Sequence, residues 1–229
     1  MPKTLHFLSG GAAQGLVGRL QAAFEQQHDC RLQGTYGAVG LMREKLMAGD
    51  PCDLLILSDA LIQGLVKDGR ATTPSAIGGV KTGLALKEGQ SAPDIRTPED
   101  LKALLQRASA LYYPDPAKAT AGIHFHKVLQ ALGLADDPRK LRTFPNGATA
   151  MAALAQAPEN DAVGCTQVTE ILITPGVRLS GLLPPPHELT TTYTAAVASD
   201  ANEPELARAL IAALTAPQAA QLRRECGFE

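Results

Sequence analysis

The stretch Asp53–Ser58, DLLILS, decides the fold class of this chain. An uninterrupted apolar run of this length, bounded by polar residues, is typical of a strand buried on both faces of a parallel sheet. Two β-rich runs precede it, at 5–8 and 31–36, and apolar residues at helical spacing follow each of the three runs. Strands that alternate with helices in this way predict an α/β fold with a mostly parallel sheet flanked by helices.

The same alternation restarts after Gly78-Gly79 and is interrupted by Pro184–Pro186, a stiff extended segment. We therefore expect two α/β lobes with a cleft between them, in which residues 1–80 and 196–229 form lobe 1 and residues 81–195 form lobe 2. Further strands are predicted at 80–86, 110–113, 141–144, 161–165 and 191–197, and two closing helices at 203–215 and 217–226.

The composition excludes several classes of function. Hydrophobic residues make up 45% of the 229 residues, charged residues make up 19%, and the formal net charge is -2. This balance allows a sizeable core but offers no basic surplus for a nucleic-acid backbone. No uncharged apolar run approaches the roughly 18 residues that a membrane-spanning helix requires. We expect no nucleic-acid partner, no membrane-embedded segment, no cofactor and, without a C-x-x-C or H-E-x-x-H motif, no metal site.

The cysteines and the first residues bear on the compartment. Cys30, Cys52, Cys165 and Cys226 are scattered and are interpreted as reduced, packed thiols, with a Cys30–Cys52 disulfide left open as the alternative. The apolar run near the start spans only about four residues, whereas a secretory leader needs roughly 7–15. We expect a periplasmic protein if a leader has been removed and a cytoplasmic one otherwise.

Loops after the predicted strands hold the candidate binding residues, because ligands of open α/β sheets bind beyond the carboxyl ends of the strands. The glycines of Ser9-Gly10-Gly11-Ala12 either leave backbone N–H groups open to an oxyanion or form a tight turn. Thr35 and Tyr36 offer hydroxyl groups, although Tyr36 also fits simple packing. The ligand-binding candidates are Ser9, Gly10, Gly11, Thr35, Tyr36, Gly37, Ala38, Ser58, Thr120, Ala121, Gly122, His124, Gln167 and Thr169.

Two of these loops also carry titratable groups. His124 is expected in the first turn of a helix, where it faces either a ligand or solvent. His126, about 200° away around the helix, is expected to face solvent. Gln167 can donate to a carboxylate, and Glu170 is either a base or an acid at a helix N-terminus.

Four segments resemble the molybdate-binding-protein-like branch of the type II periplasmic solute-binding proteins. They are Leu8–Ser58, DPAKATAGIH at 115–124, AVGCTQVTEI at 162–171 and LTAPQAAQLRRECGFE at 214–229. Molybdate binders resemble one another in an Ala-Ser-Leu-Thr element in the first loop, a serine-rich second loop and a Tyr near the fourth strand end. Here Gly11-Ala12-Ala13, Gly37–Gly40 and Gln167 stand at those places, so most of the hydroxyl donors of a tetrahedral oxyanion site are missing.

The resemblance implies a two-lobed solute-binding protein that closes on a small anion, and the missing hydroxyls favour an organic (poly)carboxylate over molybdate. If the chain is exported, the permease of an ABC transporter is the implied partner. The segments at 122–124 and 169–172 also resemble a sub-branch that contains aconitate isomerase, which interconverts cis- and trans-aconitate by allylic proton transfer. In that alternative His124 and Glu170 are the candidate bases and Tyr36 the candidate proton donor.

Overall fold

The computed structural model describes residues 2–229, and its contacts divide the chain into two compact units. Unit 1 comprises Met1–Val80 and Thr191–Glu229, and unit 2 comprises Lys81–Thr190. The chain returns to unit 1 with strand β9 (Thr190–Ala198), whereas the predicted lobe boundary falls inside that strand, at 195/196. The reason is pairing: β9 runs antiparallel to β3 (Leu54–Ser58) from Tyr193 onward.

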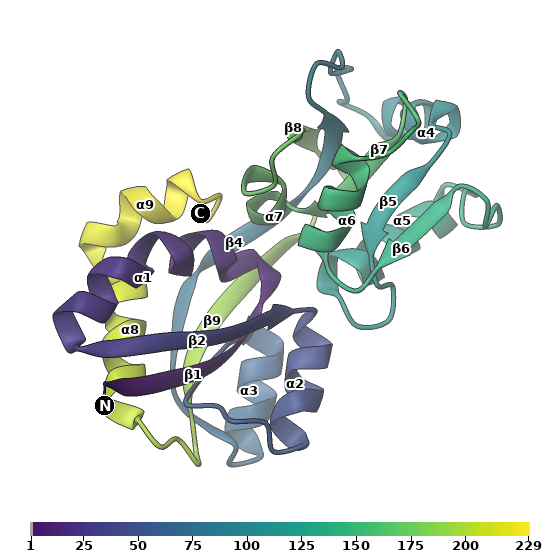
Figure 1. The fold of residues 1–229 in the computed structure, drawn as a ribbon. Helices are drawn as coiled ribbons and strands as arrows, with labels where there is room; N and C mark the ends of the chain where they lie inside the picture. Colours follow the sequence, from purple (N-terminus) through teal and green to yellow (C-terminus); the bar gives the residue numbers. More distant parts are fainter. Residues whose placement is uncertain (1) are drawn as a thin grey trace. The chain divides into compact units, whose positions relative to one another are not determined.

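Unit 1 is a helix-covered sheet whose core strands are parallel. β1 pairs in parallel with β2 on one side and with β3 on the other, and β9 follows β3. Figure 1 shows α1 and α8 on one face of this sheet and α2 and α3 on the other. Besides β3 and β9, the elements of unit 1 are β1 (Lys3–Gly10), η1 (Gly11–Ala13), α1 (Gln14–His28), β2 (Cys30–Gly37), α2 (Val39–Met47), α3 (Asp59–Lys67), the first part of β4 (Ala71–Lys87), α8 (Pro204–Thr215), η2 (Pro217–Ala219) and α9 (Ala220–Glu225).

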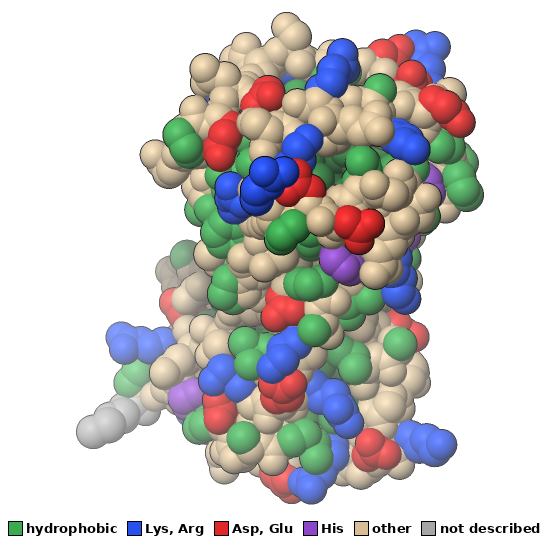
Figure 2. Space-filling view, turned by 90° about the vertical axis from the view of Figure 1, so that its right-hand side faces the viewer, with side chains coloured by type: hydrophobic (Ala, Val, Ile, Leu, Met, Phe, Trp, Pro, Cys, Tyr) green, Lys and Arg blue, Asp and Glu red, His purple; other side chains and the backbone are tan. Residues whose placement is uncertain are grey.

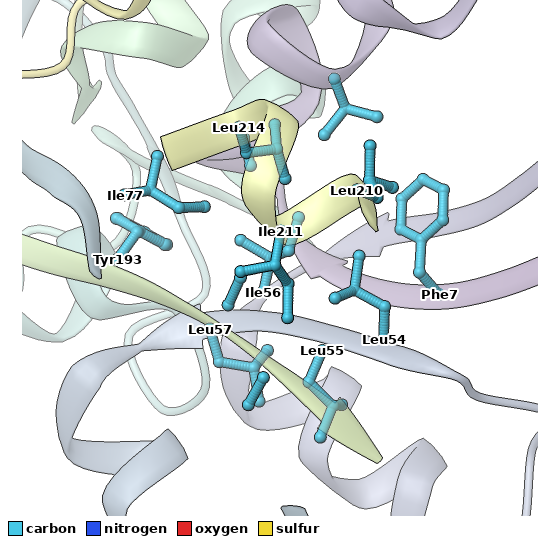
Figure 3. Packing of buried hydrophobic residues seen from close by; sticks show 14 of the residues in the cluster. Phe7, Leu54, Leu55, Ile56, Leu57, Ile77, Tyr193, Leu210, Ile211 and Leu214 are labelled. Carbon is cyan, nitrogen blue, oxygen red and sulfur yellow. The ribbon is translucent and has the colours of Figure 1, made fainter. Parts of the chain in front are cut away.

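The DLLILS run explains this architecture. Leu54, Leu55, Ile56 and Leu57 are all fully buried, because β3 lies between two strands and under helices on both faces. Figure 3 shows Leu54 and Ile56 directed toward Leu210 and Ile211 of α8, while Leu55 and Leu57 point to the opposite side. The period-2 alternation of a strand thus supplies both cores from one continuous apolar run.

Unit 2 repeats the arrangement with a mixed sheet. β5 is parallel to both β6 and β7, and β4 is antiparallel to both β7 and β8. One buried cluster joins this sheet to α4 and α5, and a second joins it to α6 and α7. Besides the second part of β4, the elements of unit 2 are α4 (Pro98–Arg107), β5 (Leu111–Pro114), α5 (Thr120–Ala131), β6 (Leu141–Phe144), α6 (Gly147–Ala155), β7 (Val163–Gln167), α7 (Val168–Leu172) and β8 (Val177–Leu182).

The α/β class is confirmed, and two local predictions are corrected. β4 begins at Ala71 and runs through Gly78-Gly79, so the glycines do not restart the pattern there. Gly79 instead exchanges two backbone hydrogen bonds with Glu229, at 2.9 and 2.8 Å. The predicted last helix is a 3-10 turn followed by the short α9, and β8 is a strand for which no prediction was made.

None of the four cysteines is in a disulfide. The free thiols are those of Cys30, Cys52, Cys165 and Cys226. Cys30 opens β2 and Cys52 precedes β3, so β1 separates them by two strand spacings, about 10 Å, which is too far for a disulfide.

Figure 2 shows acidic and basic side chains interspersed, which agrees with the small net charge. Within residues 2–229, no helix is both long enough and apolar enough to span a bilayer.

Candidate functional site

In unit 1 the first group of predicted residues lies at one sheet edge. The parallel register places Ser9 beside Tyr36 and Gly10 beside Gly37, while Ser9 also faces Ile56 of β3. The strands β1, β2 and β3 therefore end together, at Gly10, Gly37 and Ser58. Their carboxyl ends bring the N-termini of η1–α1, α2 and α3 to the same edge, as the sequence predicts for a parallel sheet.

Two of these helix N-termini are suited to an anion. Within the described chain, no side chain caps η1 at Gly10 or α2 at Ala38, and neither first turn contains an acidic residue. Their first backbone N–H groups therefore keep the partial positive charge of a helix N-terminus. The packing is close here, because a Cβ on Gly10 would lie 2.8 Å from Val39 Cγ1 and 2.9 Å from a Tyr193 ring carbon. The α3 N-terminus differs, because Asp59 places a carboxylate in its first turn.

The hydroxyl groups at this edge are less available than the sequence indicates. Ser9 is fully buried, and its Oγ donates to the Gly10 carbonyl oxygen at 2.9 Å. Thr35 is exposed, whereas the half-buried Tyr36 ring meets Phe7 edge to face, with centroids 5.5 Å apart. Desolvation raises the pKa of the Tyr36 phenol well above its ordinary value, so this group stays protonated at neutral pH.

In unit 2 the N-terminus of α5 is the corresponding feature. Its N-cap is Ala119, and no side chain among residues 2–229 caps the helix. The preceding loop is folded on itself, because the Asp115 carboxylate accepts from the N–H groups of Ala117 at 2.6 Å and Lys118 at 3.2 Å. Gly122 brings the helix onto the end of β5, since a Cβ there would collide with the carbonyl oxygens of Pro114 and Asp115.

His124 is half-buried and already partnered on one side. Its Nε2 lies 2.7 Å from the carbonyl oxygen of His187, which can only accept a hydrogen bond. A neutral His124 therefore carries its proton on Nε2, and Nδ1 keeps the basic lone pair. The prediction that His126 faces solvent is wrong: the side chain is half-buried, and its Nδ1 lies 3.1 Å from the Tyr113 hydroxyl.

Glu170 lies in the first turn of α7 and also contacts the N-terminus of the neighbouring helix α6. Its carboxylate is buried and accepts from Thr166 Oγ1 at 2.6 Å and from the backbone N–H groups of Gly147 and Ala148, which open α6, and of Gln167. Burial raises the pKa of this carboxyl, and the four hydrogen bonds partly oppose that rise. These contacts are structural: they place the Glu170 carboxyl group in the first turn of its own helix, α7, and against the N-terminus of α6.

Thr82 belongs to the same edge of unit 2, although nothing in the sequence singles it out. It lies in β4 directly opposite Gln167, the last residue of β7. Thr82, Gln167 and Thr169 are all buried, and neither the Thr82 nor the Thr169 hydroxyl has a hydrogen-bond partner within the described chain. Sequence patterns could not find Thr82, because its neighbours come from a strand more than 80 residues away.

Comparison with known proteins identifies the family. The chain is 25% identical over 238 residues to an aconitate isomerase from Pseudomonas sp, a match covering 99% of this chain and 87% of the relative. Its fold matches a periplasmic molybdate-binding protein of Azotobacter vinelandii, with TM-score 0.82, 16% identity and 98% coverage of both chains. It also matches the tungstate ABC transporter structure from Geobacter sulfurreducens, with TM-score 0.67, 15% identity and coverage of 96% and 97%. Because the profile of bacterial extracellular solute-binding proteins matches residues 5–229, the chain belongs to that family.

Proposed function

We propose that the chain binds a small organic anion with more than one carboxylate. The supporting observation is that side chains cap some of the helix N-termini and leave others uncapped. Side-chain oxygens meet the N-terminal ends of α4, α6 and α8, provided by Thr97, by Asn146 with Glu170, and by Asp53. The N-termini of η1–α1, α2 and α5 receive no such cap from the described residues, and each of these helices follows a candidate loop.

A carboxylate suits these N-termini better than a tetrahedral oxyanion does. The donors there are mainly backbone N–H groups, and a flat carboxylate can accept two of them in one plane. Tetrahedral oxyanions need donors on several sides, while residues 11–13 and 37–40 are Gly, Ala and Val without hydroxyl groups. Within unit 1 the uncapped N-termini of η1–α1 and α2 lie at one sheet edge, and such a pair fits an anion with more than one carboxylate.

Calorimetric titration tests the proposal directly. Citrate, cis-aconitate and trans-aconitate are expected to bind more tightly than molybdate, tungstate and sulfate, at equal ionic strength and pH. If molybdate or tungstate binds more tightly than the carboxylates, the proposed ligand class is wrong and the ligand is a tetrahedral oxyanion. Absence of heat and of thermal stabilisation with all six anions would contradict anion binding itself.

A charge placed at the α5 N-terminus is expected to compete with the ligand. Thr120 is the first residue of α5 and is half-buried. In Thr120→Asp the new carboxylate interacts with the helix N-terminus and repels an anion, so the affinity for the best polycarboxylate should fall at least about 10-fold. Thr120→Asn is the matched control, because it has the same shape without the charge. Equal affinities of the two variants would show that this N-terminus is not part of the binding site.

The aconitate isomerase relative favours a second function, allylic proton transfer on a tricarboxylate. A base must remove a proton from the substrate methylene carbon and return one at the far end of the three-carbon allylic unit. His124 fits this role best, because Nδ1 keeps its lone pair when Nε2 donates to the His187 carbonyl. The Glu170 carboxyl group is occupied by four donors, and the Tyr36 phenol stays protonated at neutral pH and so cannot act as the base.

Incubation with trans-aconitate followed by chromatography for cis-aconitate separates the two functions. An isomerase should convert the substrate, and His124→Gln should abolish conversion while binding persists, because the Gln amide can still donate to the His187 carbonyl. Unchanged trans-aconitate at high protein concentration leaves binding alone. In that case we propose that the chain delivers the anion to an ABC transporter permease from the periplasmic side. The fold match to the tungstate ABC transporter structure supports this role.

A further inference from the structure

A buried hydroxyl without a partner marks the unit 2 edge. Thr82 is 1% exposed, and its Oγ1 finds no hydrogen-bond partner among residues 2–229. Buried polar groups in proteins are nearly always hydrogen-bonded, and exceptions occur where a ligand, water or ion completes the bonding. The backbone of Thr82 is satisfied, because its N–H donates to the Leu189 carbonyl at 2.9 Å, so the missing partner concerns the side chain alone.

The sheet alternation shows where this hydroxyl lies. Leu84 of β4 and Cys165 of β7 are opposite each other, and both belong to the cluster that packs against α4 and α5. Two residues along each strand, Thr82 and Gln167 are again opposite each other and on that same face. The Thr82 hydroxyl and the Gln167 side chain therefore lie side by side on the face that α5 covers, at the edge where β7 ends.

One chain segment ties this edge to α5. The carbonyl of Leu189 accepts from Thr82, and two residues earlier the carbonyl of His187 accepts from His124 Nε2 at 2.7 Å. His124 is in the helix whose uncapped N-terminus begins at Thr120. Thr82, Gln167 and the first turns of α5 are thus held at one edge of one unit.

We infer that Thr82 Oγ1 is a specificity-determining hydrogen-bond donor to the anion bound at the α5 N-terminus. This inference rests on the proposed anion binding and adds to it a residue from β4. A hydroxyl can donate to a carboxylate oxygen and can also accept from a ligand hydroxyl. The residue therefore favours a ligand such as citrate, which has carboxylates that accept a hydrogen bond and a hydroxyl group that can donate one.

Three variants test the role of Thr82. Thr82→Val keeps the shape but removes a hydroxyl that has no internal partner, so the melting temperature of the ligand-free protein should stay unchanged or rise. Its affinity for citrate should fall about 10-fold, the usual effect of losing one hydrogen bond to a charged group. Thr82→Ser should retain the affinity of the unsubstituted protein. The matched control is Thr166→Val, which removes a hydroxyl bonded to Glu170 at 2.6 Å and should lower the melting temperature.

Each outcome decides between roles. If Thr82→Val lowers the melting temperature as Thr166→Val does, the hydroxyl is structural and the inference is overturned. Unchanged affinity for citrate and trans-aconitate in Thr82→Val, with the unsubstituted protein binding both, overturns the inference while leaving the proposed function intact. If the unsubstituted protein binds neither compound, the proposed function fails first.

Discussion

Gly122→Ala is expected to lower the free energy of unfolding by about 3 kcal/mol or more, because the new methyl group meets backbone atoms. A Cβ at this position would overlap the carbonyl oxygens of Pro114 and Asp115, at the end of β5 and the start of the following loop. A flexible side chain could rotate away, but these carbonyls are fixed by the sheet and by the loop. Relief of this overlap therefore requires α5 to move away from β5. Urea denaturation measures the resulting loss of unfolding free energy.

The matched control is Gly18→Ala. Gly18 is exposed in the middle of α1, and nothing lies within 4 Å of a Cβ there. Alanine is the better helix former, so this variant should gain about 0.5–1 kcal/mol. Similar stability of the two variants would show that α5 does not approach β5 as closely as the structure has it. Gly122→Ala should also weaken anion binding, since the α5 N-terminus is displaced.

The elements that sequence could predict are those specified by local pattern. Leu141–Phe144 is a strand with the predicted limits, and the DLLILS run forms the buried strand that it indicates. The sequence Thr97-Pro98-Glu99-Asp100 is typical of a helix start, and Thr97 and Asp100 form a full capping box at the N-terminus of α4. Local apolar periodicity and capping residues act within a few positions, so they can be recognised in a single sequence.

What could not be predicted depends on partners distant in the chain. The early start of β4 and the pairing of Gly79 with Glu229 need a C-terminus that lies 150 residues later. The sequence predicts Gly122 as a ligand residue, yet its contacts also show a steric requirement for glycine. Glu170 lies in the first turn of its own helix, as the sequence indicates, but it also accepts from the first N–H groups of a helix formed by residues 147–155. Residue type predicted that these positions matter, and only the fold shows what each one contacts.

Asp53→Ala is expected to have an effect as large as that of Gly122→Ala, about 3–5 kcal/mol of unfolding free energy. Asp53 opens the DLLILS run and is 1% exposed. Its Oδ2 accepts from the His6 N–H at 2.8 Å, and its Oδ1 accepts from the N–H groups of Asn202 at 2.7 Å and Glu203 at 3.0 Å. Alanine leaves three backbone donors without their acceptor and removes a negative charge from the N-terminal end of α8.

Asp53→Asn separates the contribution of charge from that of shape, and Asp200→Asn is the control. The amide oxygen can still accept from Asn202 and Glu203, but its NH2 group then faces the His6 N–H, so we expect a loss of about 2–3 kcal/mol. The Asp200 side chain is 90% exposed and 3.9 Å from Arg70, and its substitution should change stability by less than about 0.5 kcal/mol. Urea denaturation of the three variants should therefore rank Asp53→Ala below Asp53→Asn and both well below Asp200→Asn. Equal stability of all three would mean that Asp53 does not join β3 to the N-terminal end of α8.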